Sequence, residues 1–244
     1  MLNRVVELVQ TMWDDGFERG LSGDRDGQYQ LDVAVDEAIV PLLLEAGFAV
    51  LSEESGLQAG QRDVLVVVDP IDGSTNADRA IPMAACSLCA IDSDGPWVAV
   101  VRDLVRRTTY RAERGHGAFR DHERLSVRHC ATVSDAIVGI NGWSPVPPPG
   151  AQFRTFGCAS VELCLVADGA LDAYVNLDLN GHGPWDYLGG ALIVTEAGGV
   201  VGELTGRDLS DIGHGVRRAV VAGANADICR SVIDAYAPVV GGGQ

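Results

Sequence analysis

The sequence predicts an α/β protein of layered architecture. An antiparallel-sheet α+β first half, residues 1–134, is expected to precede an α/β second half, residues 135–244, within one compact unit. Two stretches with helical spacing of apolar residues precede a series of strand-like runs in the first half, whereas strands and helices alternate in the second. With 244 residues, of which 47% are hydrophobic, the chain is long enough to bury a substantial core.

The first half opens with two expected helices. Apolar residues recur at helical spacing over residues 2–13 and again from Leu31 to a stop at Gly47. The Gly- and Asp-rich stretch 16–30 between them is expected to be an exposed, mobile loop, and residues 20–30 are a candidate lid. Short apolar or β-branched runs bounded by turn residues then predict strands at 49–51, 64–68, 83–91, 96–103 and 107–112.

The second half begins with an expected strand at 136–141. The proline cluster 145–150 breaks the pattern and predicts an exposed extended segment near the junction of the two halves. Beyond it, the pattern predicts helices at 157–169, 187–197 and 226–236, which alternate with strands at 171–175, 200–204 and 219–222.

The charge balance restricts the partners of the protein. Its net charge of −16 would repel nucleic-acid backbones and anionic membranes, so neither is an expected partner. The chain contains no lysine, which excludes lysine Schiff-base chemistry. The cysteines are scattered and no signal peptide or long apolar span is visible, so we expect reduced thiols and a cytoplasmic protein. A phosphate substrate would require bound cations to offset the acidic excess.

The segment from Asp69 to Asn76, Asp-Pro-Ile-Asp-Gly-Ser-Thr-Asn, is the strongest candidate for a functional site. It follows a strand expected to be buried on both faces, and α/β proteins place their chemistry where such strands end. Carboxylates beside the backbone N–H groups of Gly73, Ser74 and Thr75 suggest a hard metal ion bridging protein and phosphate. An ordinary turn with a serine N-cap is the alternative interpretation of the segment on its own.

Four separated motifs together resemble the inositol monophosphatase family. Glu53-Glu54 precedes the Asp69–Asn76 segment, and Gly115-His-Gly-Ala-Phe119, Trp185-Asp186 and the run from Val194 to Val200 follow it in the family's order. The resemblance implies a layered αβαβα sandwich of the sugar-phosphatase type. It also implies Mg²⁺-dependent hydrolysis of a small polyol, sugar or cyclitol phosphate by a metal-activated water.

The resemblance implies roles for individual residues as well. Glu53, Asp69 and the backbone carbonyl of Ile71 would hold a first Mg²⁺, and Asp69, Asp72 and Asp186 a second, with two or three ions per site. Two such ions can clamp the attacking and leaving oxygens of an in-line displacement. The catalytic residues would be Glu53, together with Ser74 and Asp36 orienting the attacking water, and the phosphate would lie on the N–H groups of residues 73–75.

The expected substrate-binding residues come from the second half. Gly157 and Ala159 match the family segment that lines the substrate. Asn176 stands where inositol-specific members carry a hydroxyl-binding glutamate, and Asp178 or His182 is a candidate replacement.

The substrate and the assembly state therefore stay open. Alternative substrates are histidinol phosphate, a nucleoside monophosphate or phosphoadenosine, and fructose 1,6-bisphosphate. A catalytically silent metal- and phosphosugar-binding protein is the non-enzymatic alternative, and a homodimer is a possible assembly.

Overall fold

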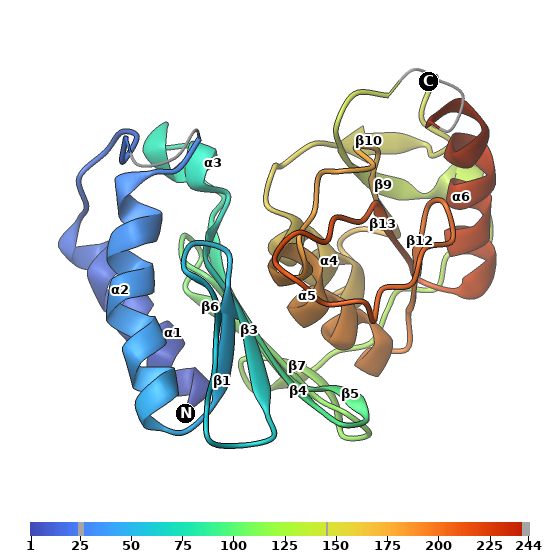
Figure 1. The fold of residues 1–244 in the computed structure, drawn as a ribbon. Helices are drawn as coiled ribbons and strands as arrows, with labels where there is room; N and C mark the ends of the chain where they lie inside the picture. Colours follow the sequence, from blue (N-terminus) through green and yellow to red (C-terminus); the bar gives the residue numbers. More distant parts are fainter. Residues whose placement is uncertain (24–26, 145, 241–244) are drawn as a thin grey trace.

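Five layers make up the protein in the computed structural model, which describes residues 1–23, 27–144 and 146–240 (Figure 1). Two helices cover one face of a large first sheet, two further helices lie between this sheet and a smaller second one, and a last helix covers the outer face of the second sheet. The helices are α1 (Leu2–Asp15), α2 (Gln30–Glu45), α3 (Ser74–Asp78), α4 (Ala159–Ala167), α5 (Pro184–Glu196) and α6 (Ala226–Val240), with a short 3₁₀ turn at Val133–Asp135. This order confirms the predicted αβαβα sandwich.

The first sheet has eight strands in the order β2-β1-β3-β4-β5-β6-β7-β8. All neighbouring pairs are antiparallel except β1 and β3. Its strands are β1 (Ala49–Ser52), β2 (Gly56–Gln58), β3 (Leu65–Asp72), β4 (Ala85–Asp92), β5 (Gly95–Asp103), β6 (Thr108–Glu113), β7 (Gly117–Arg120) and β8 (Glu123–Arg124).

The second sheet has five strands in the order β10-β9-β11-β13-β12. It mixes parallel pairs, β10 with β9 and β9 with β11, with antiparallel pairs, β11 with β13 and β13 with β12. Its strands are β9 (Ile137–Asn141), β10 (Gln152–Arg154), β11 (Ala173–Asn176), β12 (Val200–Glu203) and β13 (Val220–Gly223).

Strand β3 is buried on both faces, as its apolar run predicts. Val66 and Val68 pack into the core beneath α1 and α2, whereas Val67 packs into the core beneath α4 and α5. Cys86 and Cys89 of β4 have a spacing that also occurs in metal and redox sites, but their side chains divide between the same two cores and pack there as buried residues.

Two differences from the predicted elements concern the candidate site. Strand β3 continues to Asp72 instead of ending at residue 68, and its register against β4 shifts between Asp69 and Asp72, where Pro70 has no N–H to donate. Helix α5 begins at Pro184 rather than at residue 187, because proline is favoured in the first turn of a helix. Both carboxylates of β3, and Asp186, therefore belong to regular elements.

The candidate lid at residues 20–30 lies partly outside the described residues, because 24–26 are not described. The residues that flank this gap form an antiparallel bridge between Leu21 and Tyr29, and the backbone N–H of Gly20 donates to Asp78 of α3 at 2.7 Å. Within the described ranges, no helix is long and apolar enough to cross a membrane.

Candidate active site

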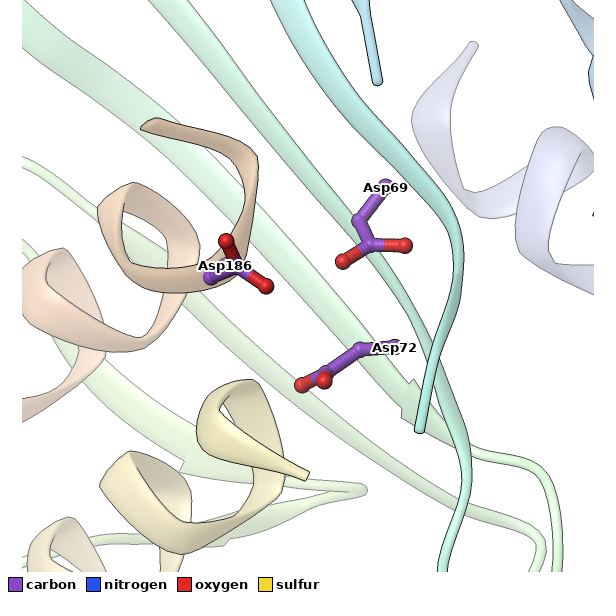
Figure 2. Close-up of side chains that lie close together, drawn as sticks. All are labelled: Asp69, Asp72 and Asp186. Atoms are coloured by element: carbon purple, nitrogen blue, oxygen red, sulfur yellow. The ribbon is translucent and has the colours of Figure 1, made fainter. Parts of the chain in front are cut away.

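Three carboxylates from two elements meet between the first sheet and the inner helices. Asp69 and Asp72 lie at the end of β3, and Asp186 lies in the first turn of α5, which packs against β3. One oxygen from each of the three lies within 4.8 Å of the others, and Figure 2 shows the three side chains pointing toward a common centre. The structure thus brings together residues that are far apart in the sequence.

Of the three carboxylates, Asp69 has the fewest hydrogen-bond partners. It is 1% exposed, and neither of its carboxylate oxygens has a hydrogen-bond partner among the residues that the structure describes. Burial raises its pKa well above the ordinary value, and the negative charges of Glu53, Asp72 and Asp186 raise it further. A divalent cation would compensate all of these charges, and oxygen-only donors of this kind suit Mg²⁺. The residues present therefore fit the metal that the motif implies.

Backbone donors orient the other two carboxylates. The N–H of Ser160, in the first turn of α4, donates to Oδ2 of Asp72 at 2.6 Å, and the N–H of Gly183 donates to Oδ2 of Asp186 at 2.6 Å. Each carboxylate is thus fixed through one oxygen by a helix N-terminus, where negative charge is favourable.

Glu53 lies beside this cluster. It directly follows β1, and its N–H donates to the carbonyl of Val68 in β3 at 3.1 Å. Burial raises its pKa to about 8, with added repulsion from Glu54, Asp32 and Asp72, while Arg217 acts in the opposite direction. Its charge in turn raises the pKa of Asp69 and of Asp186, so it belongs to the same electrostatic unit.

The predicted pairing of Asp36 with Ser74 is wrong. The Ser74 hydroxyl lies 2.5 Å from Oδ1 of Asp32 and 2.8 Å from the carbonyl of Ile71, while Asp36 accepts a hydrogen bond from Ser52. The two aspartates lie one helical turn apart on the same face of α2. Which of them reaches Ser74 depends on how α2 lies against β3, which the sequence pattern does not specify.

Asp32 is buried, and only one of its two carboxylate oxygens is hydrogen-bonded. In the described part of the chain, its Oδ2 has no hydrogen-bond partner. Burial raises its pKa to about 7 against the opposing effect of the Ser74 hydrogen bond, and the charge of Glu54 raises it further. A carboxylate that has a pKa near neutrality and is hydrogen-bonded to a hydroxyl is suited to accept a proton at neutral pH.

The turn after β3 requires glycine at residue 73. Gly73 has φ of +87°, and a Cβ there would lie 2.9 Å from the carbonyl oxygen of Met83. The backbone then enters α3 at Ser74, and the Thr75 hydroxyl lies 3.0 Å from the Tyr29 hydroxyl.

A cavity of about 270 Å³ opens beside these groups. Ser74, Asp32, Glu53 and Trp185 contribute to its lining, and so do residues that the sequence patterns did not single out: Tyr29, His214 and Arg217. His214 and Arg217 lie between β12 and β13 in a stretch without a recognisable motif. The signal that could have found them is the cationic pair Arg217-Arg218 in an acidic, lysine-free chain.

Residues 3–233 match the model of the inositol monophosphatase family. The chain belongs to this family. It is 31% identical over 209 residues to "Nus factor SuhB" of Escherichia coli strain K12, covering 79% of this chain and 77% of that protein. It is 32% identical over 197 residues to "Fructose-1,6-bisphosphatase/inositol-1-monophosphatase" of Archaeoglobus fulgidus, covering 79% and 76%. The solved structure of a Pyrococcus horikoshii protein described as having similarities for inositol-1 monophosphatase shares the fold, with a TM-score of 0.84, 24% identity and coverage of 96% of this chain and 97% of that one.

In this member of the inositol monophosphatase family, the substrate-binding role predicted for Asn176 is wrong. Its side chain is 0% exposed. Its oxygen accepts from Asn141 and from the N–H of Asp178, and its nitrogen donates to the carbonyls of Asp178 and Arg218. The amide therefore stabilises the loop after β11 and has no donor or acceptor left for a ligand.

The other predicted substrate residues differ in accessibility. Asp178 is exposed and caps the N–H of Asn180, and it is not among the described residues that line the cavity. His182 is buried with its Nε2 2.7 Å from the Tyr174 hydroxyl, so it is not available as a replacement. Ala159 is also buried, and the Gly157 carbonyl accepts from Asn76 at 3.2 Å. Substrate contacts by Gly157, Ala159 and Asp178 stay predictions.

Proposed function

We propose that this protein hydrolyses a small phosphate monoester of a polyol, sugar or cyclitol, with Mg²⁺ as cofactor. The observation that carries the proposal is that Asp69 is buried between Asp72 and Asp186 and has no hydrogen-bond partner within the described ranges of the chain. Such an arrangement is costly unless a cation is bound, and it lies beside a hydroxyl–carboxylate pair and a glycine turn. Membership of the inositol monophosphatase family supports the same reaction class.

The metal ligands in this proposal are Glu53, Asp69, the carbonyl of Ile71, Asp72 and Asp186. Bound Mg²⁺ would supply charge neutralisation for the anionic ester and a water activated for attack. The backbone N–H groups of Gly73, Ser74 and Thr75 would donate hydrogen bonds to the phosphate oxygens. We retain two or three ions per site as the expected number.

Ser74 and Asp32 orient the attacking water in this scheme. The Ser74 hydroxyl lies within hydrogen-bond distance of both Asp32 and the Ile71 carbonyl, and after donating its one proton its oxygen can still accept a hydrogen bond from the water. The water oxygen forms a bond to phosphorus while the bond from phosphorus to the ester oxygen breaks, which yields an alcohol and inorganic phosphate. This assigns to Asp32 the role that the sequence analysis gave to Asp36.

A panel of phosphate esters tests the proposal. Purified protein would be assayed for phosphate release with Mg²⁺ and with EDTA, on an inositol phosphate, histidinol phosphate, a nucleoside monophosphate, phosphoadenosine phosphate and fructose 1,6-bisphosphate. Release should require Mg²⁺ and disappear in Asp69→Asn. Asp234→Asn, which makes the same chemical change at an exposed position of α6, is the matched control and should keep full activity.

The panel also distinguishes the non-enzymatic alternative. Mg²⁺-dependent binding of phosphate esters without release from any of them would contradict hydrolysis and favour a catalytically silent binding protein. A cytoplasmic location, a homodimer and the absence of nucleic-acid partners stay predictions, the last resting on the net charge of −16.

A further inference from the structure

We propose that Arg217 is a phosphate-binding residue of this site, which contacts phosphoryl oxygens of the ligand from the loop between β12 and β13. The inference deepens the proposed function and rests on it for the nature of the ligand. It concerns a side chain that no sequence motif singled out and that belongs to neither the carboxylate cluster nor the α3 turn.

The guanidinium of Arg217 is fixed along one edge. Its Cζ lies 5.0 Å from the centroid of the Trp185 ring, and its Nη1 donates to the carbonyls of His214 and Val216 at 2.9 and 2.8 Å. Within the described part of the chain, its Nε and Nη2 have no hydrogen-bond partner. Two unused donors in a planar fork match the geometry of two phosphate oxygens.

The positive charge of Arg217 is also unpaired. Among the described residues, none of its nitrogens lies within 4.0 Å of a carboxylate oxygen, although Asp32, Glu53 and Glu54 line the same cavity. Its field nevertheless reaches the metal-ligand candidates, because its charge partly opposes the rise in the pKa of Glu53 and of Asp186 that burial causes. An anion that entered the cavity would therefore meet this cation without first breaking an ion pair.

The loop that carries Arg217 is anchored at both ends by Glu203. This buried carboxylate accepts hydrogen bonds from the N–H groups of Thr205 and Arg207 at one end of the loop and of Ala219 at the other. Two further bonds come from the Arg207 side chain. Rigid support at both ends reduces the entropy lost when Arg217 engages a ligand.

His214 fastens the middle of the same loop to the first sheet. Its Nε2 lies 2.8 Å from the backbone carbonyl of Glu53, and since a carbonyl only accepts, Nε2 carries the proton. Its ring also lies against Trp185, with centroids 5.2 Å apart. The loop is therefore fixed to Glu53 and Trp185 at the point from which Arg217 faces the cavity.

This placement makes the two expected effects of Arg217 opposite in sign. Its charge attracts phosphate but repels the divalent cations held by Glu53 and Asp186. Arg217→Gln should therefore weaken phosphate binding by about tenfold and tighten Mg²⁺ binding by about threefold. Loss of a residue with only a structural role would weaken both.

The experiment compares wild type, Arg217→Gln, Arg217→Lys and Arg230→Gln. Mg²⁺ binding is measured calorimetrically without phosphate, and inorganic phosphate binding is measured by ³¹P NMR line width at saturating Mg²⁺. Arg217→Lys should recover part of the phosphate affinity. Arg230, whose side chain is 69% exposed on α6, is the matched control and should leave both affinities unchanged.

Two results would overturn the assignment. One is phosphate affinity in Arg217→Gln equal to that of wild type, and the other is a parallel loss of phosphate and Mg²⁺ affinity. Both readouts are independent of turnover. A protein that binds phosphate through Arg217 but hydrolyses no ester would contradict the proposed function alone, whereas an active enzyme with unchanged affinities in the variant would contradict the Arg217 assignment alone.

Discussion

Asp69 and Glu203 are both buried carboxylates, but their surroundings are opposite. No described residue donates a hydrogen bond to Asp69, and burial and the charges of nearby carboxylates raise its pKa. Burial would raise the pKa of Glu203 too, but hydrogen bonds from Arg207, Ala219 and Thr205 outweigh it and lower the pKa to about 2. A carboxylate that accepts several hydrogen bonds stabilises the fold. A carboxylate without donors among like charges destabilises it, and a bound cation can offset that unfavourable free energy.

The largest expected effect is that of Asp69→Asn. Phosphate release should fall by more than about a thousandfold, because the variant lacks the carboxylate that we propose as the central metal ligand. In EDTA the same variant should be more stable than wild type by about 1–3 kcal/mol, because it removes a buried group that repels its neighbours. Phosphate assays and urea unfolding measure the two quantities. If Asp69→Asn were less stable than wild type in EDTA, Asp69 would stabilise the metal-free fold as Glu203 does, and the contrast between the two carboxylates would be wrong.

Glu203→Gln should have the opposite effect on stability. We expect a loss of about 2–4 kcal/mol at pH 7 by urea unfolding, since several donors lose a charged acceptor. The pKa of Glu203 is lower in the folded protein, about 2, than its ordinary 4.5, so its contribution is present above pH 4.5 and is lost as the pH falls toward 2. The difference between wild type and variant should therefore shrink in acid. Glu7→Gln, at an exposed position of α1, is the control.

Asp32 lies between these extremes, since one of its oxygens is bonded to Ser74 and the other has no partner. Asp32→Asn should lower kcat by about a hundredfold, in the range of lost acid–base assistance. Asp36→Asn makes the same change one turn away and should act mainly on stability, through Ser52. A larger loss of kcat in Asp36→Asn would restore the assignment made from the sequence.

The smallest expected effect concerns pH and Mg²⁺. The metal-free protein should lose stability as the pH rises from about 4.5 to about 8, because the raised pKa of Glu53 means that the folded state holds protons which the unfolded state has released. Mg²⁺ should remove this slope and raise Tm by a few degrees, about 1–2 kcal/mol. Thermal melts across this pH range, with Mg²⁺ or EDTA, measure it. A stability that rises with pH in EDTA would contradict the burial of uncompensated carboxylates.

Local sequence patterns predicted where Asp69 and Asp186 lie relative to their strand and helix. Five apolar residues before Asp69 indicated a strand buried on both faces, and the position of Asp186 directly before a helical pattern indicated a carboxylate at the start of a helix. The family resemblance placed the two together, and the structure brings them within reach of one ion. What the sequence predicted well is thus what short stretches determine by themselves.

The errors have a different physical origin. Asp32 and Asp36 share a helix face, so only the placement of α2 on the sheet selects between them. Asn176 has the chemistry of a ligand-binding amide, but its four hydrogen bonds come from Asn141, Asp178 and Arg218, a combination visible only in three dimensions. Arg217 was missed because the anchor of its loop, Glu203, also acts through tertiary contacts.

The position of α5 has a consequence for biosynthesis. This helix packs against β3, β4 and β5 although it follows β11 in the chain, and it carries Asp186. A chain emerging from the ribosome can form the first sheet and still lack the third carboxylate of the cluster. The three carboxylates that could hold a cation therefore come together only when α5 docks against the first sheet.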